Sequence, residues 1–524
     1  MHNSAPKTLG ESIKSRIEHL IKDKFKIHEQ VPNPEFPKNL DYGELFTDIA
    51  FKLAPLLKMP PNKIAQEIST ELQDFGAEVK GGFINFKIPV SKSLEFLGIE
   101  KLDLLSGKKI LCEYVSANPT GPLHIGHGRI AAVGDSISRI LKFCGADVVR
   151  EFYINDAGEQ IEKIGLAILG KSQEYKGEYT ESVKRKIQEM NLSDSESIGF
   201  AASRIILEDI KKTLARFGLE FDSWVSEKEI SSKYSKKAME LMEKYLYYQE
   251  GALFLRTTMF GDDKDRVVIK SDGKPTYFGN DCAYHLFKVE RNFDELVQVW
   301  GADHHGYINR IQAVLNIFGF KNKFVVKLVQ MVNLLKDGKP FQMSKREGTF
   351  VSLDELIDEV GADAVRFIYL TRTADSHLDF DIDLAKKQSL ENPVYYVQYA
   401  HARTSSLFRE AKNKNLYDGY ENWKRENWKK QNSRLKTSER ERKLIALSSV
   451  LYDIISVSAK MYEPSTITTF LMSLAREFHS YYQKERILVD DIDTRFSRLL
   501  TCEIVQKAIR TGLDLLGVRA PDKM

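Results

Sequence analysis

Two histidines in a loop rich in glycine and proline are the residues of this sequence best suited to chemistry. The loop runs from Ser116 to Gly128 and contains His124-Ile125-Gly126-His127. The two histidines are three positions apart, so both rings lie on one side if a helix begins here. Two imidazole N–H donors beside a helix N-terminus suit a triphosphate, and Gly126 lets a nucleotide approach the backbone closely. A metal pair or incidental loop histidines are the alternatives, although the loop offers no third metal ligand.

A second segment with basic side chains lies much later in the chain. Gln342-Met343-Ser344-Lys345-Arg346 precedes a helix-like run from Leu353 to Val360. The ammonium of Lys345 is a strongly hydrated point charge, which suits a leaving pyrophosphate. Taken alone, such a segment is more often a basic surface loop.

The pattern around the histidine loop predicts a parallel sheet. Residues 109–115 and 148–154 have strand patterns and flank a helix-like run from Arg129 to Phe143, which together predict a βαβ unit. Further buried strands are expected at 296–300 and 324–328. Because ligands bind at the carboxyl ends of strands in such sheets, the histidine loop and the run from Gly301 to Gly306 are both well placed.

The whole chain of 524 residues is expected to form three domains. The predicted fold class is multidomain α/β: an N-terminal α+β domain (1–103), a Rossmann-like parallel-sheet domain (104–388) and a C-terminal all-α helical bundle (389–524). A mostly helical insertion is expected at about 160–250 within the sheet domain.

Composition excludes several classes of protein. Lys and Arg (77) nearly balance Asp and Glu (74), and the net charge of +3 means that any nucleic-acid surface must be local. The four cysteines are scattered, so neither a disulfide framework nor a structural zinc site is expected. No apolar run reaches the ~18 residues of a membrane span, and we expect a soluble, cytoplasmic protein.

The histidine motif and Met343-Ser344-Lys345-Arg346 together resemble the class I aminoacyl-tRNA synthetases. The flanking sequence is most similar to the arginyl-tRNA synthetase family, in the runs 113–119, 277–281, 392–403 and 512–524. Two features depart from the family pattern. Gln342 and Arg346 stand where lysine and serine are usual, and His305 stands where some relatives carry glutamine.

This resemblance implies a ligase that activates L-arginine with ATP to arginyl-adenylate and pyrophosphate. The arginyl group would then pass to the 3′-terminal adenosine of tRNA(Arg). Catalytic roles are implied for His124, His127 and Lys345. The implied ATP-binding residues are Ala117, Asn118, Pro119, Thr120, Gly121, Pro122, Leu123, His124, Ile125, Gly126, His127, Gly301, Asp303, His304, Met343, Ser344 and Lys345.

The resemblance also implies the residues that contact arginine and tRNA. The arginine pocket would contain Glu113, Ser116, Asn118, His127, Tyr277, Asp281 and His305, and two carboxylates match the planar fork of a guanidinium. The residues expected to contact tRNA are Phe83, Asn85, Tyr395, Tyr399 and Met524, with Phe478, Tyr481 and Tyr482 as further aromatic candidates. Mg²⁺ is expected to arrive with ATP, and the chain is expected to be a monomer.

Three alternatives remain open at the level of sequence. A cysteinyl- or class I lysyl-type synthetase would change only the substrate, although the scattered cysteines do not supply thiolate zinc ligands. A smaller nucleotidylyltransferase also uses an HxGH turn, but it leaves the helical C-terminus unexplained. A non-catalytic tRNA-binding paralogue is disfavoured by the intact His124, His127 and Lys345.

Overall fold

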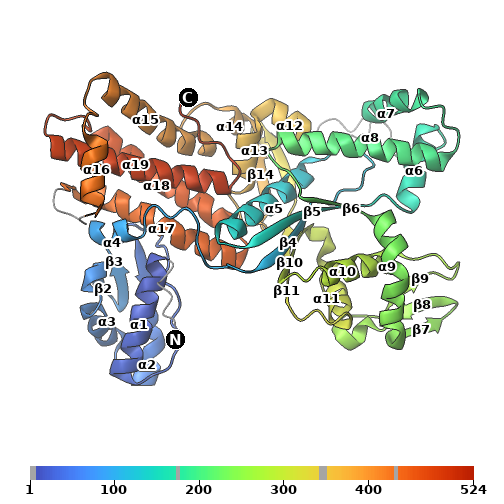
Figure 1. Ribbon diagram of the computed structural model, residues 1–524, viewed down its shortest axis with the longest axis horizontal. Helices are drawn as coiled ribbons and strands as arrows, with labels where there is room; N and C mark the ends of the chain where they lie inside the picture. Colours follow the sequence, from blue (N-terminus) through green and yellow to red (C-terminus); the bar gives the residue numbers. More distant parts are fainter. Residues whose placement is uncertain (1–7, 173–176, 342–350, 430–434) are drawn as a thin grey trace. The chain divides into compact units, whose positions relative to one another are not determined.

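The computed structural model describes residues 8–172, 177–341, 351–429 and 435–524. The chain divides into two compact units (Figure 1). The first contains residues 1–105, 143–145 and 388–524, and the second contains residues 106–142 and 146–387. Both ends of the chain therefore belong to one unit, and the finer division at 103 and 388 stays a prediction.

A parallel five-stranded sheet forms the centre of the second unit, with the order β11-β10-β4-β5-β6. The strands are β4 (Lys109–Tyr114), β5 (Asp147–Ile154), β6 (Ser223–Ser226), β10 (Glu295–Gly301) and β11 (Lys323–Val329). The chain runs outward from β4 to β6 and then returns to the other side of β4 through β10. The order in which the chain adds strands to the sheet therefore reverses between β4 and β10. Open α/β sheets bind their ligands at such a point. The predicted Rossmann-like sheet is confirmed.

Helices and two small sheets complete the second unit. The helices are α5 (Ile125–Phe143), α6 (Glu159–Ile168), α7 (Glu178–Gln188), α8 (Ser195–Arg216), α9 (Glu227–Met242), α10 (Tyr277–Glu290), α11 (Ile308–Ile317), α12 (Leu353–Val360), α13 (Ala362–Tyr369) and α14 (Ile382–Lys386). The small sheets contain β7 (Leu246–Gln249), β8 (Ala252–Leu255) and β9 (Arg266–Ile269), and β12 (Val332–Lys336), β13 (Lys339–Pro340) and β14 (Leu378–Asp381). Because β6 pairs with β5, residues 223–226 belong to the central sheet, and the helices expected as an insertion are interrupted there.

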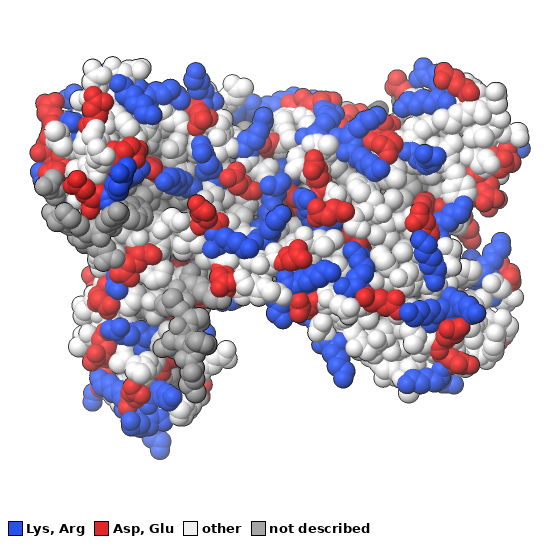
Figure 2. Space-filling model, in the orientation of Figure 1, with Lys and Arg blue, Asp and Glu red and all other residues white. Residues whose placement is uncertain are grey.

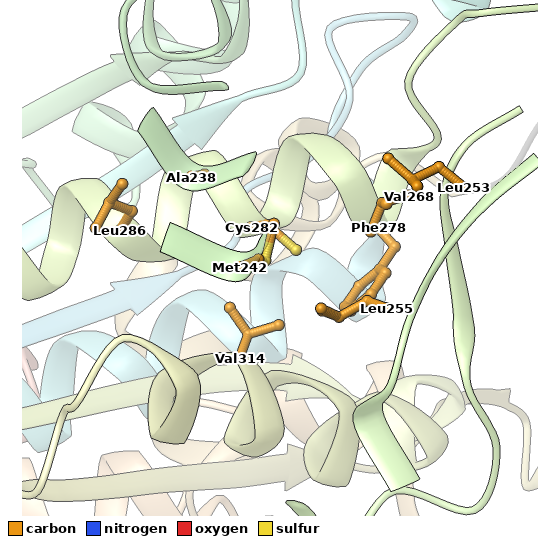
Figure 3. Packing of buried hydrophobic residues seen from close by; sticks show 9 residues of the cluster. All are labelled: Ala238, Met242, Leu253, Leu255, Val268, Phe278, Cys282, Leu286 and Val314. Carbon is orange, nitrogen blue, oxygen red and sulfur yellow. The ribbon is translucent and has the colours of Figure 1, made fainter. Parts of the chain in front are cut away.

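Helix α10 presents two different faces. Its apolar face carries Phe278, Cys282 and Leu286, which pack in a buried cluster with residues of α9, β8, β9 and α11 (Figure 3). The opposite stripe carries Tyr277, Asp281, Tyr284, His285 and Lys288, at the three- and four-residue steps of one helix face. Packing of the apolar face therefore fixes the direction in which the polar stripe points.

Helix α5 packs so closely on β4 that a side chain at Gly134 is excluded. A Cβ at this position would lie 2.3 Å from Cγ of the Tyr114 ring, which is fully buried. We expect Gly134→Ala to lower the free energy of unfolding of this unit by about 1–3 kcal/mol, because the ring has no room to yield. Urea denaturation followed by tryptophan fluorescence measures this change. Gly306→Ala is the control, since its added methyl meets nothing within 4 Å, and equal effects of the two substitutions would contradict the expectation.

The first unit combines a small antiparallel sheet with a helical bundle. Its strands, in the order β1-β3-β2, are β1 (Leu45–Thr47), β3 (Phe83–Phe86) and β2 (Ala77–Lys80). Its helices are α1 (Leu9–Phe25), α2 (Ile49–Leu57), α3 (Pro61–Thr70), α4 (Val90–Glu95), α15 (Pro393–Asn413), α16 (Tyr420–Lys429), α17 (Glu439–Met461), α18 (Ser465–Lys484) and α19 (Ile492–Leu515). Arg442 on α17 pairs with Glu44 beside the sheet and donates to the carbonyl of Ile88, so the two parts of this unit are joined by buried polar contacts.

One helix in the described part of the chain, α17, is long and apolar enough to cross a membrane by length and composition alone. Of its apolar window, 83% is buried inside the protein, as in the core helix of a bundle. On the face that Figure 2 shows, Lys and Arg side chains are interspersed with Asp and Glu. This mixture agrees with the small net charge and favours local contacts with nucleic acid over a broad cationic field.

Candidate active site

A pocket of about 1560 Å³ opens at the carboxyl ends of β4 and β10. It brings together most of the residues predicted for arginine and ATP. The predicted residues in its wall are Glu113, Ser116, Ala117, Asn118, His124, Ile125, Gly126, His127, Tyr277, Asp281, Gly301, Asp303 and His304. The predicted residues outside its wall are Pro119, Thr120, Gly121, Pro122, Leu123 and His305. Met343, Ser344 and Lys345, with Gln342 and Arg346, lie outside the described residues.

The two histidine rings stack on each other at the start of α5. Their centroids are 3.6 Å apart, with an interplanar angle of 23°. Nδ1 of His124 accepts hydrogen bonds from the backbone N–H of Gly126 (3.1 Å) and of His127 (3.3 Å). The imidazole of His124 therefore caps the helix N-terminus, and its proton must be on Nε2.

Both imidazoles are neutral at physiological pH. Burial lowers the pKa of His124, although the nearby Asp303 opposes the shift. Burial, and then the neighbouring His124, lower the pKa of His127 to about 3. These side chains therefore offer neutral N–H donors rather than cations.

The missing side chain of Gly126 also makes room for a neighbouring side chain, and its predicted role toward the nucleotide stays a prediction. The sequence suggested that its missing side chain leaves room for a nucleotide. In the structure, a Cβ on Gly126 would lie 2.9 Å from Cε1 of His124. The imidazole of His124 occupies the space beside Gly126. A larger residue at position 126 would collide with this imidazole where it caps the helix.

The segment that leads into α12 lies beside the histidines. His124 and Ser352 form an antiparallel β-bridge, and the N–H of Leu353 donates to the carbonyl of Leu123 over 2.7 Å. Helix α12 then begins at a capping box in which Ser352 and Glu355 bind each other's backbone N–H. The histidine turn is thus fixed from two sides, by its own helix and by this bridge.

Two further carboxylates in the pocket wall, Asp281 and Glu227, have no cationic partner in the part of the chain that the structure describes. Asp281 on α10 has its pKa raised to about 7 by burial and by the charges of Glu227 and Glu113. Glu227, at the start of α9, is 2% exposed, and burial raises its pKa to about 6. Its hydrogen-bond partners within the described residues are neutral: Asn280 Nδ2 donates to it over 2.7 Å, and the hydroxyl of Tyr153 also donates to it. Within the described residues neither carboxylate forms an ion pair, so this wall is suited to receive a cation.

Glu113 differs from these acids because it already has a partner. Oε2 accepts from Lys288 Nζ over 2.5 Å and from Gln298 Nε2 over 2.8 Å, while Oε1 accepts from the hydroxyl of Ser116 over 3.0 Å. Burial would raise the pKa of Glu113, but the ammonium of Lys288, together with His285 and the hydroxyl of Ser116, more than offsets burial and the pKa is lowered. Oε1 of Gln298 has no hydrogen-bond partner in the described part of the chain and borders the pocket as a free acceptor.

Three parts of the chain match models of known protein families. Residues 7–88 match the arginyl tRNA synthetase N terminal domain, residues 99–197 and 204–377 match the catalytic domain of class I (R) tRNA synthetases, and residues 397–524 match the DALR anticodon binding domain. The arginine–tRNA ligase of Aquifex aeolicus is 39% identical, over 98% of this chain and 100% of that relative. The arginine–tRNA ligase of Syntrophotalea carbinolica is 42% identical, over 94% and 95%.

The chain belongs to the arginyl-tRNA synthetase family. The solved structure of the arginyl-tRNA synthetase of Thermus thermophilus covers 99% of this chain and 100% of its own, with a TM-score of 0.79 and 21% identity, and so shares the fold. The resemblance inferred from the sequence is therefore confirmed.

Two residues of the pocket wall, Glu227 and Gln298, and the buried Lys288 behind it were missed by sequence reasoning. Glu227 follows Ser226, whose side chain caps α9, and it could have been found only by recognising Ser223–Ser226 as a strand that ends at the pocket. Gln298 lies in the expected strand β10 and gives no signal of its own. Lys288 could have been found from the polar stripe on α10, because it continues the steps from Asp281 and Tyr284.

The residues predicted to contact tRNA lie in the first unit. Phe83, 41% exposed, and Asn85 line a second pocket of about 330 Å³, together with two lysines and other side chains. Tyr395 and Tyr399 stack along α15, with centroids 5.9 Å apart, and Met524 at the chain end is 49% exposed.

Two of the further aromatic candidates prove unsuitable for stacking on bases. Phe478 and Tyr481 are buried in the helical bundle, at 0% and 1% exposure, because they belong to the apolar face of α18. Tyr482 is half-buried and lies beneath the guanidinium of Arg403, which is 4.1 Å from the ring centroid. Helical spacing alone could not separate core aromatics from exposed ones.

Proposed function

We propose that this chain activates L-arginine with ATP in the pocket between β4 and β10 and transfers the arginyl group to tRNA(Arg). Membership of a family of ATP-dependent arginine–tRNA ligases supports the overall reaction. The choice of arginine rests on one observation: the half-buried Asp281 and the buried Glu227 are carboxylates that form no ion pair among the described residues, in the same pocket as the histidine turn.

The guanidinium of arginine binds to Asp281 and Glu227. A guanidinium is planar and presents its donors in a fork, so two carboxylates can each accept from it. Lysine carries its charge on one compact, strongly hydrated ammonium, which cannot reproduce the planar fork that reaches both acids. A neutral amino acid would leave both unpaired, which costs several kcal/mol and makes discrimination strong without proofreading.

The other end of the amino acid binds near β4. Oε1 of Gln298 and the carboxylate of Glu113 are acceptors for the α-ammonium, and both side chains border the pocket. Ser116 and Asn118 are polar groups on the loop that follows, and Tyr277 stands at the pocket wall with 47% of its surface exposed. These placements support their predicted roles in arginine binding. His305 does not line the pocket, so no contact to arginine is proposed for it.

ATP occupies the part of the pocket beside the histidine turn. A carboxylate oxygen of arginine attacks the α-phosphorus, the bond to the β-phosphate oxygen breaks, and pyrophosphate leaves. The carboxylate is already ionised near neutral pH, so the protein supplies positioning and hydrogen bonds rather than a base. His124 and His127 donate N–H bonds to the phosphates, while Gly301, Asp303 and His304 border the nucleotide. Lys345 keeps its predicted role toward pyrophosphate.

Mg²⁺ enters as part of the ATP substrate. Within the described residues, no three His, Cys, Asp or Glu side chains are grouped to hold a metal ion. The ion would therefore be held mainly by phosphate oxygens and water, as is common for Mg²⁺.

In the second step a ribose hydroxyl of the terminal adenosine attacks the arginyl carbonyl, and AMP leaves. The predicted contacts of Phe83, Asn85, Tyr395, Tyr399 and Met524 with tRNA are supported by their partial exposure on the first unit. A cytoplasmic location and a monomeric state complete the proposal.

Amino-acid-dependent exchange of pyrophosphate into ATP tests this function. Each amino acid is assayed with and without tRNA, because members of this family often require tRNA for activation. Arginine should support exchange, and lysine and cysteine should not. Exchange driven by another amino acid but not by arginine would overturn the proposed specificity.

We expect arginine affinity to decrease as the pH falls below 7. In the empty pocket the pKa of Asp281 is raised to about 7 and that of Glu227 to about 6, mainly by burial. Both acids must lose their protons before they bind a guanidinium, so Kd should rise roughly tenfold from pH 7 to pH 6 and more steeply below pH 6. Calorimetry in buffers of different ionisation enthalpy would report the released proton. Binding that is independent of pH between 5.5 and 8 would contradict this expectation.

A further inference from the structure

Lys288 is a lysine without any access to solvent. Its side chain is 0% exposed, and its ammonium lies 2.5 Å from Glu113 Oε2 and 3.9 Å from the centroid of the Tyr284 ring. A buried ammonium is costly unless it is paired, and a hydrophobic residue of similar volume often stabilises a core equally well. Stability alone therefore does not account for this residue.

The partner of Lys288 holds the turn that ends β4. Glu113 Oε1 accepts from the hydroxyl of Ser116, and the same hydroxyl accepts from the backbone N–H of Tyr153 on β5. These contacts therefore connect Lys288 to Glu113 and Glu113 to Ser116. Ser116 is the first residue of the loop that carries the histidines.

This turn is strained. Val115 and Ser116 have φ values of +70° and +40°, in the left-handed region, and neither is glycine. The N–H of Ser116 donates to the carbonyl of Tyr114 over 3.0 Å, which closes a tight turn around Val115. Such conformations cost of order 1–3 kcal/mol each and persist only where surrounding contacts hold them. The hydrogen bond between Ser116 and Glu113 is one of those contacts.

Lys288 is the one cation that pairs with Glu113 within the described residues. The groups that face this carboxylate are Lys288, His285, Tyr284 and Asp281 from α10, Gln298 from β10, Tyr153 from β5 and Ser116 from its own loop. Burial lowers the pKa of His285 to about 3, and burial raises the pKa of Tyr284 well above its usual range, so both are neutral. Asp281 adds a negative charge when ionised and would push Glu113 toward its protonated form.

We propose that Lys288 is a positioning residue for amino-acid activation, which keeps Glu113 ionised so that the carboxylate holds Ser116 and the strained turn leading to the histidine loop. The proposal rests on the proposed function of this pocket. It assigns Lys288 no contact with arginine or ATP. Its effect on the turn runs through the charge of Glu113, and its separate electrostatic effect on Asp281 is lost equally in Lys288→Gln and in the double variant that also carries Glu113→Gln.

The pH dependence of Lys288 variants separates this role from simple packing. In Lys288→Gln, the buried Glu113 loses its ammonium and should become protonated near neutral pH, since unpaired buried glutamates reach pKa values of about 8–9. We expect kcat/KM for arginine in pyrophosphate exchange to fall roughly 50-fold at pH 6.5 but less than about fivefold at pH 9. The KM for ATP should change less than about threefold. Lys288→Arg keeps the charge and should retain the wild-type pH profile.

The double variant Glu113→Gln with Lys288→Gln is the matched control. It has no carboxylate at position 113 left to titrate, while Asp281 and Glu227 are the same as in the single variant. The pH-dependent loss that we assign to Glu113 should therefore be absent from it. A constant ratio of Lys288→Gln to wild type from pH 6.5 to pH 9 would overturn the proposal, as would the same pH-dependent recovery in the double variant.

Two further results have defined meanings. If Lys288→Gln fails to fold by circular dichroism, Lys288→Arg decides: a wild-type pH profile supports the proposal, and a newly acquired ionisation overturns it. If wild-type protein shows no arginine-dependent exchange even with tRNA, the proposed function fails. If the wild-type protein is active and Lys288→Gln loses the same factor of activity at every pH, the proposed role of Lys288 fails and the proposed function stands.

Discussion

Asp281→Asn should raise the KM for arginine roughly 30- to 5,000-fold while the KM for ATP stays within about threefold of the wild-type value. Asparagine has nearly the same shape, so the substitution removes one negative charge facing the guanidinium. Loss of one partner from a buried, hydrogen-bonded charge pair costs about 2–5 kcal/mol, which corresponds to this range. Glu227 remains and retains part of the binding energy. Steady-state pyrophosphate exchange, with each substrate varied in turn, measures both constants.

Asp272→Asn is the control for this experiment. Asp272 lies in the exposed turn after β9, outside the pocket, and its substitution should leave both constants unchanged. Equal increases in the KM for arginine and for ATP would remove Asp281 from the guanidinium site. The substitution should also abolish the loss of arginine affinity that begins near pH 7, and leave the loss below pH 6 that we assign to Glu227.

The architecture of the site could be predicted because it depends on local patterns. Four of the five strands of the central sheet lie within a residue or two of their predicted positions, since long buried strands have continuous apolar runs. The rule that ligands bind at strand ends then placed the histidine loop and the run from Gly301 on one edge of the sheet. Glu113 and Asp281, which are far apart in sequence, do meet in the same pocket.

The remaining features depend on contacts that no local pattern reveals. Strand β6 has only four residues and follows a helical region, so Glu227 was not connected with the pocket. The start of α5 was expected at Arg129 but lies at Ile125, because an imidazole caps the helix where serine, threonine, aspartate or asparagine is usual. Glu113 was expected in the arginine pocket, and its pairing with Lys288 was not foreseen, because the polar stripe on α10 does not show which of its residues would contact β4.

The capping imidazole changes what the histidine turn can offer to ATP. At an uncapped helix N-terminus, phosphate oxygens would accept from free backbone N–H groups. Here the N–H groups of Gly126 and His127 donate to Nδ1 of His124. The proton on Nε2 of His124 is then the donor that faces outward, and the backbone dipoles behind the ring strengthen it. The proton of His127 is also on Nε2, because its Nδ1 accepts from the N–H of His124 over 3.4 Å.

The activity that remains after His127 is replaced should therefore depend on which ring nitrogen the new side chain reproduces. We expect His127→Ala to slow pyrophosphate exchange by about 10²–10³-fold, the usual cost of one donor to a charge that develops in the transition state. Gln places its amide nitrogen near the position of Nε2, whereas Asn places it near that of Nδ1. His127→Gln should therefore retain at least about tenfold more activity than His127→Asn, with little change in the KM for arginine. Single-turnover formation of the adenylate measures the rates. Equal rates for the two amides would show that the site does not depend on a donor at the position of Nε2. Recovery of activity with His127→Lys would show that it needs a positive charge. Either result would contradict the neutral Nε2–H donor deduced from the pKa of about 3.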